Sequence, residues 1–150
     1  MKRVRTMLSQ TTAGKFFAAR DGAIAVEFAM IAPVFLMIVF GIIMYGSYLA
    51  VIHGVQQLAA EAARSSIAGL SEGERSTLAS SYITGNVNSY PLIDPAKLTV
   101  NAATSPSDAN VFIVTVNYNA SGMFIYSLPT FVPTPSPTIV RSAAIPRGGY

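Results

Sequence analysis

The longest feature in the hydrophobic pattern is an apolar run near the N-terminus. It begins at Ala23 and lasts to about Ile52, and no charged residue lies between Phe28 and Gly46. A membrane-spanning helix needs about 20 predominantly apolar residues. The apolar core of a secretory signal peptide is shorter, at about 7–15 residues. The run therefore predicts a transmembrane helix over residues 23–52.

Helical periodicity continues beyond the apolar run. Residues 53–68 are rich in helix formers. Small and apolar residues recur there at helical spacing: Val55, Leu58, Ala59, Ala62 and Ser66. Glu61 and Arg64 are placed to form an i,i+3 ion pair. We therefore expect one helix from residue 23 to about 68, stopped by Gly69, with its outer half packed under a small head.

A second, shorter helix follows. Ser71 and Glu74 have the spacing of a capping box, in which each side chain caps the other residue's backbone N–H. This pattern predicts a helix over residues 72–84, with Leu78 and Tyr82 on one face.

The last third of the chain has the alternation and β-branched density of strands. We predict strands over residues 97–103 and 110–118, a third over 121–128 and a last over 138–145. Four prolines make residues 129–137 unsuitable for a central strand. Five aromatic residues are assigned to the core: Phe112, Tyr118, Phe124, Tyr126 and Phe131. The predicted fold class is therefore membrane-anchored α+β, a long N-terminal transmembrane helix continuing into a head with a short helix and an antiparallel sheet.

Charge is distributed unevenly along the chain. The net charge is +3, but the basic excess lies in residues 1–22, which carry Lys2, Arg3, Arg5, Lys15 and Arg20 against Asp21. By the positive-inside rule this tail stays in the cytoplasm and the residues after about 52 lie outside. Nucleic-acid binding would need basic residues clustered on the folded body. We therefore predict no nucleic-acid partner.

Composition excludes several kinds of chemistry. The chain has no cysteine, a single histidine and only 11% charged residues. Disulfides, cysteine nucleophiles and histidine-ligated metal clusters are excluded, and no phosphate-binding loop is present. His53 is interpreted as a surface or interfacial residue, and Asp94 and Asp108 as loop acids. We predict no catalytic residue, no metal, no cofactor and no small-molecule substrate.

Glu27 is an exception within the apolar run. It lies four residues after Ala23, where the run begins. An ionised side chain at the centre of a spanning helix costs about 2.5–3.5 kcal/mol, and such groups are functional candidates by default. A position near the cytoplasmic headgroups, where the carboxylate reaches water, is the alternative. Position alone does not decide between these interpretations.

The residues around Glu27 carry a resemblance. Arg20-Asp21-Gly22 precedes Ala23, and Glu27-Phe28 follows at the fifth and sixth positions of the apolar helix. This arrangement resembles the type IV prepilin signal. The resemblance implies that a prepilin peptidase cuts the Gly22–Ala23 bond on the cytoplasmic side. It also implies that Glu27 pairs with the new terminal amine of a neighbouring subunit and sets the register between subunits.

The wider segment, residues 20–64, resembles the TadE-like family of minor pseudopilins of tight-adherence (Flp) pilus assembly systems. The resemblance rests further on Pro33, Gly41 and Gly46, where it implies helix packing, and on the alanine-rich stretch before Arg64. It implies a non-enzymatic protein of the bacterial inner membrane. The implied partners are the membrane, the prepilin peptidase, other pilins and pseudopilins, and Tad assembly proteins. Met44 stands where many members have a glutamate, and Ala23 where major pilins begin with phenylalanine, so the subfamily stays open.

These observations divide the chain into three regions and leave two alternatives. Residues 1–22 are the cytoplasmic leader, 23–52 the transmembrane helix and 53–150 the periplasmic head. The leading hypothesis is a minor pseudopilin that is processed and takes part in assembly of an adhesive pilus. The main alternative is an uncleaved, signal-anchored periplasmic binding module. A membrane-tethered hydrolase ranks last, because it would depend on His53 or on a carboxylate pair.

Overall fold

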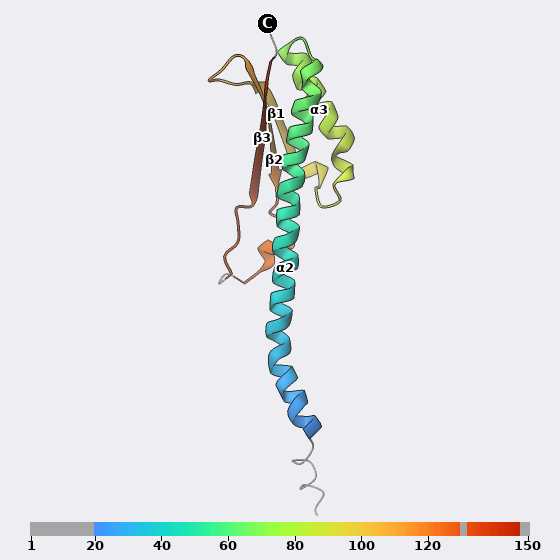
Figure 1. The fold of residues 1–150 in the computed structure, drawn as a ribbon, viewed down its shortest axis with the longest axis vertical. Coiled ribbons are helices and arrows are strands. Elements are labelled where there is room, and N and C mark those ends of the chain that lie inside the picture. Colours follow the sequence, from blue (N-terminus) through green and yellow to red (C-terminus); the bar gives the residue numbers. More distant parts are fainter. Residues whose placement is uncertain (1–19, 130–131, 148–150) are drawn as a thin grey trace, which may run out of the picture. The chain divides into compact units, whose positions relative to one another are not determined.

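The structure, a computed structural model, describes residues 20–129 and 132–147. Lys2, Arg3, Arg5 and Lys15 of the predicted leader lie outside the described residues. The chain divides into two compact units, residues 1–41 and residues 42–150. The elements along the chain are α2 (Arg20–Ser65), α3 (Glu72–Asn86), β1 (Leu98–Thr104), β2 (Val111–Asn119) and β3 (Thr138–Pro146), with short 3-10 turns between them (Figure 1).

The long N-terminal helix is confirmed. α2 continues through Pro33 and passes at Ser65 into a single 3-10 turn that ends at Ala68. From Gly22 to Ala68 it is long and apolar enough to cross a membrane, and none of its most apolar window is buried. The hydroxyls of Ser65 and Ser66 donate to carbonyls three residues earlier, at 2.8 and 2.7 Å, which satisfies acceptors near the helix end.

Gly69 ends the helix for a reason other than the predicted one. Its φ is −74°, which any residue adopts. A Cβ on Gly69 would instead lie 2.7 Å from Cγ and 2.8 Å from the backbone nitrogen of Arg75. The glycine is required because the chain folds back tightly onto α3 at this point, and no left-handed conformation is involved.

α3 begins with a modified capping box. Ser71 Oγ accepts a hydrogen bond from the backbone N–H of Glu74 at 3.2 Å, as predicted. The Glu74 carboxylate reaches back one residue further than predicted, to the backbone N–H of Leu70 at 2.9 Å. The inner face of α3 is formed by Arg75, Ala79 and Ile83. The predicted pair Leu78 and Tyr82 flanks that face and is half-buried.

Three of the four predicted strands are confirmed within about a residue. They form one antiparallel sheet in the order β1-β2-β3, and Tyr118 of β2 lies opposite Leu98 of β1 and Ile139 of β3. The prediction of a strand at residues 121–128 is wrong. β2 ends where the side chain of Asn119 accepts from the backbone of Ser121 at 3.0 Å, and Phe124–Ser127 then forms a 3-10 turn. Local turns therefore take hydrogen bonds that a fourth strand would need.

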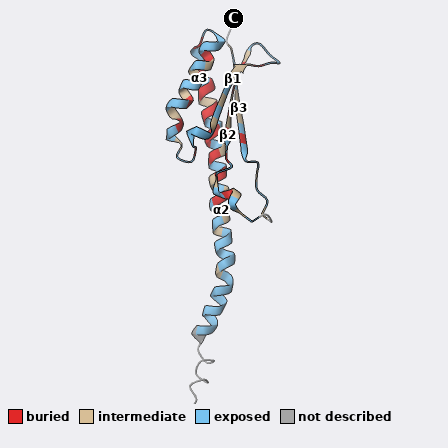
Figure 2. Ribbon diagram, turned by 180° about the vertical axis from the view of Figure 1, so that it is seen from behind, coloured by how far each residue is buried: buried red, intermediate tan, exposed pale blue. Residues whose placement is uncertain are grey.

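The core of residues 42–150 lies between the sheet and the two helices (Figure 2). α2 and the 3-10 turn that follows it contribute the five residues predicted from helical spacing, all of them 0% exposed: Val55, Leu58, Ala59, Ala62 and Ser66. Phe112 and Tyr118 are buried as predicted, whereas Phe124 is 70% exposed and is not a core residue. Tyr126 is half-buried, and Phe131 lies outside the described residues.

The compact unit that contains the head includes the last turns of the predicted transmembrane segment, residues 23–52. It starts at Ile42, and Met44, Tyr48 and Val51 of α2 are already buried in it. The last turns of the predicted transmembrane helix therefore pack against protein on one side.

Candidate assembly site

The residues that the sequence singles out for processing and assembly all lie on α2: Gly22, Ala23, Glu27, Phe28, Pro33, Gly41 and Gly46. All but Gly46 belong to the unit that ends at Gly41. No side chain from Gly22 to Ile43 is buried. The sequence-predicted residues are therefore available to partners along one helix and are not gathered into a pocket.

Gly22 and Ala23 lie in the first turn of α2, which begins at Arg20. The first four N–H groups of a helix have no partner within the helix, so this turn unwinds at little cost. No heavy atom lies within 4 Å of the position that a Cβ on Gly22 would take. The Gly22–Ala23 bond is therefore unobstructed by the rest of the described chain.

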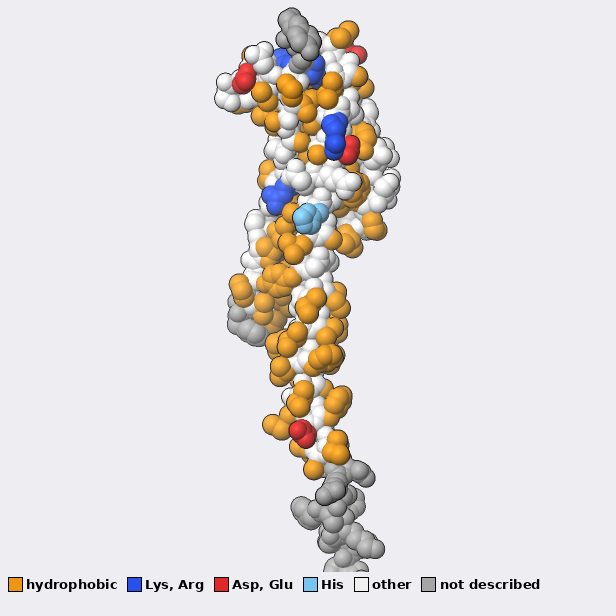
Figure 3. Space-filling model, in the orientation of Figure 1, with side chains coloured by type: hydrophobic (Ala, Val, Ile, Leu, Met, Phe, Trp, Pro, Cys, Tyr) orange, Lys and Arg blue, Asp and Glu red, His pale blue; other side chains and the backbone are white. Residues whose placement is uncertain are grey.

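Glu27 stands alone among apolar side chains. Its neighbours Val26 and Phe28 are 62% and 70% exposed, and the space-filling view shows one acidic side chain on this hydrophobic length of helix (Figure 3). Among the described residues, Glu27 belongs to neither of the two ion pairs. Ala23 precedes it by four residues, on the same helix face and about 6 Å away along the axis.

Pro33, Gly41 and Gly46 alter the surface of the helix. Pro33 has no N–H, so the carbonyl of Ala29 lacks its helical donor. Nothing lies within 4 Å of the Cβ positions at Gly41 and Gly46, so both leave open notches. At 100° per residue the two notches face about 140° apart, and Gly41 lies within about 40° of Glu27. Gly41 thus shares the side of the helix that carries Glu27.

Two tyrosines of α2 have a role that the sequence did not predict. Tyr45 and Tyr48 lie near the end of the apolar run, a position typical of interfacial aromatics at a membrane exit. In the structure the Tyr45 hydroxyl donates to the carbonyl of Pro133, and the Tyr48 hydroxyl donates to the carbonyl of Ser136 at 3.0 Å. The hydroxyl of Tyr126 donates to the same Ser136 carbonyl at 2.8 Å. Burial and the neighbouring Tyr48 raise the pKa of Tyr126 to about 12.

Two further polar residues fasten α3 to the sheet. Arg75 is 7% exposed, and its Nη2 donates to the carbonyl of Arg147 at 2.8 Å. The Glu72 carboxylate accepts from the backbone N–H and the hydroxyl of Thr104, at 3.2 and 2.9 Å. These two hydrogen bonds, the backbone one first, lower the pKa of Glu72. Neither contact follows from a local pattern, because the partners lie 32 or more residues away.

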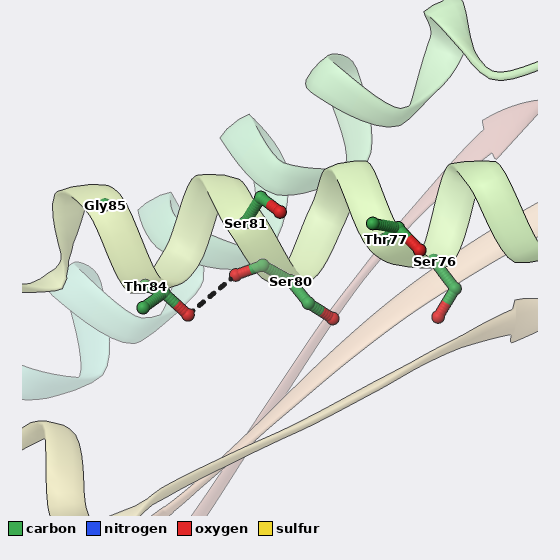
Figure 4. A pocket seen from close by; sticks show the side chains of 6 residues that line it. All are labelled: Ser76, Thr77, Ser80, Ser81, Thr84 and Gly85. Atoms are coloured by element: carbon green, nitrogen blue, oxygen red, sulfur yellow. Dashed lines mark hydrogen bonds between the residues drawn. The ribbon is translucent and has the colours of Figure 1, made fainter.

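The outer face of α3 carries a shallow, hydroxyl-lined depression (Figure 4). Its lining residues are Ser76, Thr77, Ser80, Ser81, Thr84 and Gly85. The Thr84 hydroxyl is already bonded to the carbonyl of Ser80 at 3.0 Å. None of the lining side chains titrates near neutral pH, so the depression offers no general acid or base.

The described residues also contain no cluster of metal-ligating side chains. No three His, Asp or Glu side chains lie close enough together among them to hold a metal ion. His53 is exposed on α2. Asp94 and Asp108 act as loop acids, accepting from the backbone of Ala96 at 3.0 Å and of Asn110 at 2.8 Å.

A family model described as TadE-like protein matches residues 22–64. The match begins at Gly22, ends at Arg64 and covers under a third of the chain. It confirms the resemblance found in the sequence and supports a Tad pilus-associated protein whose single apolar helix suggests a membrane anchor. Such pilus-associated proteins are structural rather than catalytic. No curated protein and no solved structure matches the chain.

Proposed function

We propose that this TadE-like chain is a minor pseudopilin. A prepilin peptidase removes residues 1–22, and the mature protein takes part in assembling a Tad/Flp-type adhesive pilus. The observation that carries the proposal is Glu27, a lone carboxylate on an exposed apolar helix, four residues after the cleavage position. The TadE-like match over the same residues supports it.

The chemistry of Glu27 explains why cleavage and assembly are coupled. An unpaired carboxylate held among apolar groups is costly, and a cation that pairs with it offsets that cost. Cutting the Gly22–Ala23 bond produces an α-ammonium on Ala23, at the N-terminus of the helix. The ammonium of one subunit and the Glu27 carboxylate of its neighbour neutralise each other. Because Ala23 and Glu27 are about 6 Å apart along the axis, the pair also fixes the stagger between neighbouring helices.

The apolar surface around Glu27 supports assembly through the same helix. Phe28 is 70% exposed, and Gly41 leaves an open notch on the side of Glu27. Small residues let helices approach closely in a membrane, where packing and polar contacts drive association. The packing partners are other pilins, pseudopilins or Tad assembly proteins in the bacterial inner membrane.

The proposal assigns a place to each region of the chain. Residues 1–22 lie in the cytoplasm, 23–52 enter the inner membrane and 53–150 lie in the periplasm. The positive-inside rule supports this orientation, because five basic residues precede the apolar run and the next follows only at Arg64. In this proposal the protein acts as a structural subunit, and we assign it no catalytic role.

The N-terminal residue of the membrane-extracted protein tests the proposal. We expect Ala23 in cells that have their prepilin peptidase and an intact leader in cells that lack it. Gly22→Leu should block the cut, because a bulky side chain occupies the cleavage position. Gly41→Leu, on the same helix, should leave it unchanged. An intact leader in both cells would contradict processing and favour the uncleaved, signal-anchored module.

A further inference from the structure

A loop at one end of the sheet has an unusual composition. This basal loop joins β2 to β3 and is described over residues 120–129 and 132–137. Its ends are tied where Ala120 N–H donates to the carbonyl of Pro137 at 2.7 Å. No charged residue occurs between Ala109 and Val140. Phe124, on the 3-10 turn of the loop, is 70% exposed. One exposed ring alone is ordinary on a protein surface, so its meaning depends on what lies beside the loop.

The loop is held beside the apolar part of α2. The hydroxyls of Tyr45 and Tyr48 reach the carbonyls of Pro133 and Ser136. These tyrosines follow directly on Ile42 and Ile43, which are 70% and 58% exposed. The basal loop therefore lies next to the helix at the level where exposed apolar side chains give way to buried ones.

The uncovered length of α2 matches a bilayer. Burial begins at Met44, which is 8% exposed, whereas no side chain from Gly22 to Ile43 is buried. At 1.5 Å per residue, the helix from Ala23 to Ile43 is about 30 Å long. The hydrocarbon core of a bilayer is also about 30 Å thick. With hydrocarbon beginning at Ala23, its outer boundary with the headgroups falls at the basal loop, so residues 44–52 of the predicted membrane segment lie in the outer interface and beside the head.

The loop has the chemistry that this boundary favours. Tyrosines concentrate there because the ring is apolar and the hydroxyl is polar, and Tyr45, Tyr48 and Tyr126 surround the loop carbonyls. Lys97, whose ammonium lies 2.7 Å from the Cβ position of Gly122, is paired with Asp94 at 3.7 Å. The loop thus brings no net charge to the bilayer, so contact with it does not depend on anionic lipids.

We propose that the basal loop is a second membrane contact, which inserts Phe124 into the outer-leaflet interface of the bilayer spanned by α2. The occupant of this surface is lipid, because the bilayer that covers Ile42 and Ile43 reaches the loop tied beside them. The head is thereby held against the membrane surface. The proposal requires that α2 spans a bilayer, and it does not require cleavage after Gly22.

Tryptophan fluorescence of the full chain tests the contact. The chain contains no tryptophan, so Phe124→Trp introduces a single emitter at a site where the ring is exposed. The variant is reconstituted in neutral phosphatidylcholine vesicles, with and without bromine on the acyl chains. We expect blue-shifted emission and a roughly twofold loss of intensity in the brominated vesicles, as for a ring about 5–10 Å into the interface.

Two matched variants define the outcomes. Ile43→Trp should be quenched, since it reports the spanning helix, and Leu70→Trp, at a residue 95% exposed beyond α2, should not be quenched. If Phe124→Trp behaves like Leu70→Trp while Ile43→Trp is quenched, the loop contact is refuted and the pseudopilin proposal stands. Blue-shifted emission without quenching would show that protein, such as a second copy, covers the ring, and would also refute it. An unquenched Ile43→Trp would overturn both the loop contact and the spanning helix.

Discussion

The first and second halves of α2 differ in how much apolar residue they contain and in where it lies: apolar residues dominate from Gly22 to Gly41, whereas polar and charged residues interrupt them after Val51. From Gly22 to Gly41 no side chain is buried, and apolar groups surround the helix on all sides. From Val51 to Ala63 a stripe of small and aliphatic residues is buried against the head, while Gln56 and Gln57 are exposed on the other side. A helix that is apolar all round needs an apolar surrounding, whereas one with a single apolar stripe needs only one packed partner. The first half therefore needs an apolar surrounding, which in our proposal lipid and other subunits supply, whereas the second half packs on its own chain.

The sharpest test of this comparison uses one carboxylate from each half. We expect Glu27→Ala to reduce assembled pili at least about tenfold, because removing one partner of a buried ion pair costs about 3–5 kcal/mol. Glu61→Ala removes a surface pair with Arg64, 2.8 Å long and worth about 0–1 kcal/mol, and should leave assembly unchanged. Pili sheared from cells are quantified. Normal piliation in the Glu27 variant would count heavily against the pairing.

A leucine from each half tests where the helix stabilises the fold. Leu58 is 0% exposed, so Leu58→Ala leaves a cavity and should lower the free energy of unfolding of the head by about 2–5 kcal/mol. Leu36 is 48% exposed, and Leu36→Ala should leave that free energy unchanged. Unfolding in detergent is followed by circular dichroism. Equal losses in both variants would mean that the two halves form one cooperative unit.

The turn that ends the second half gives a smaller effect. Gly69→Ala places a methyl group against the backbone of Arg75, at 2.8 Å, and the shift it forces should cost about 1–3 kcal/mol. Gly73→Ala meets nothing within 4 Å and should stabilise α3 by up to about 1 kcal/mol. The same unfolding measurement compares them. A neutral Gly69→Ala would show that the turn relaxes without loss.

The smallest expected effect is a dependence on pH. The pKa of Glu72 is lowered from 4.5 by the two hydrogen bonds from Thr104. Its contribution to stability is therefore fully present above pH 4.5 and is lost as the pH falls through the lower, folded-state pKa. Glu72→Gln should unfold more readily than the original chain at neutral pH, and the difference should disappear in acid. A difference that persists unchanged at low pH would assign the effect to packing instead of charge.

The sequence predicts what depends on local pattern. The extent of α2, the cap at Ser71 and the strands that became β1, β2 and β3 follow from periodicity and residue type. The buried stripe of Val55, Leu58 and Ala62 follows from helical spacing alone. The motif of Gly22, Ala23 and Glu27 is visible in the same way, because all of its members lie on one helix.

What the sequence does not predict depends on contacts between distant residues. Residues 121–128 of the basal loop have the apolar content of a strand and were predicted as one. That content does not reveal the turn that begins at Asn119. Tyr45 and Tyr48 find carbonyl acceptors 88 residues away, and no periodicity links such partners. Phe124 was assigned to the core because aromatic residues usually are buried, and its exposure comes from the 3-10 turn that carries it.

The position of β3 has a consequence for the behaviour of the head in solution. β3 is the last strand of the sheet, and a free edge is a template on which other chains aggregate. Pro137 precedes this strand and Pro146 ends it, and proline cannot extend a ladder of hydrogen bonds. Arg141 and Gln56 also occupy the carbonyls of Val140 and Ser142, at 3.0 and 3.4 Å. Replacing Arg141 and Gln56 would thus leave the edge of β3 unprotected and favour aggregation of the isolated protein.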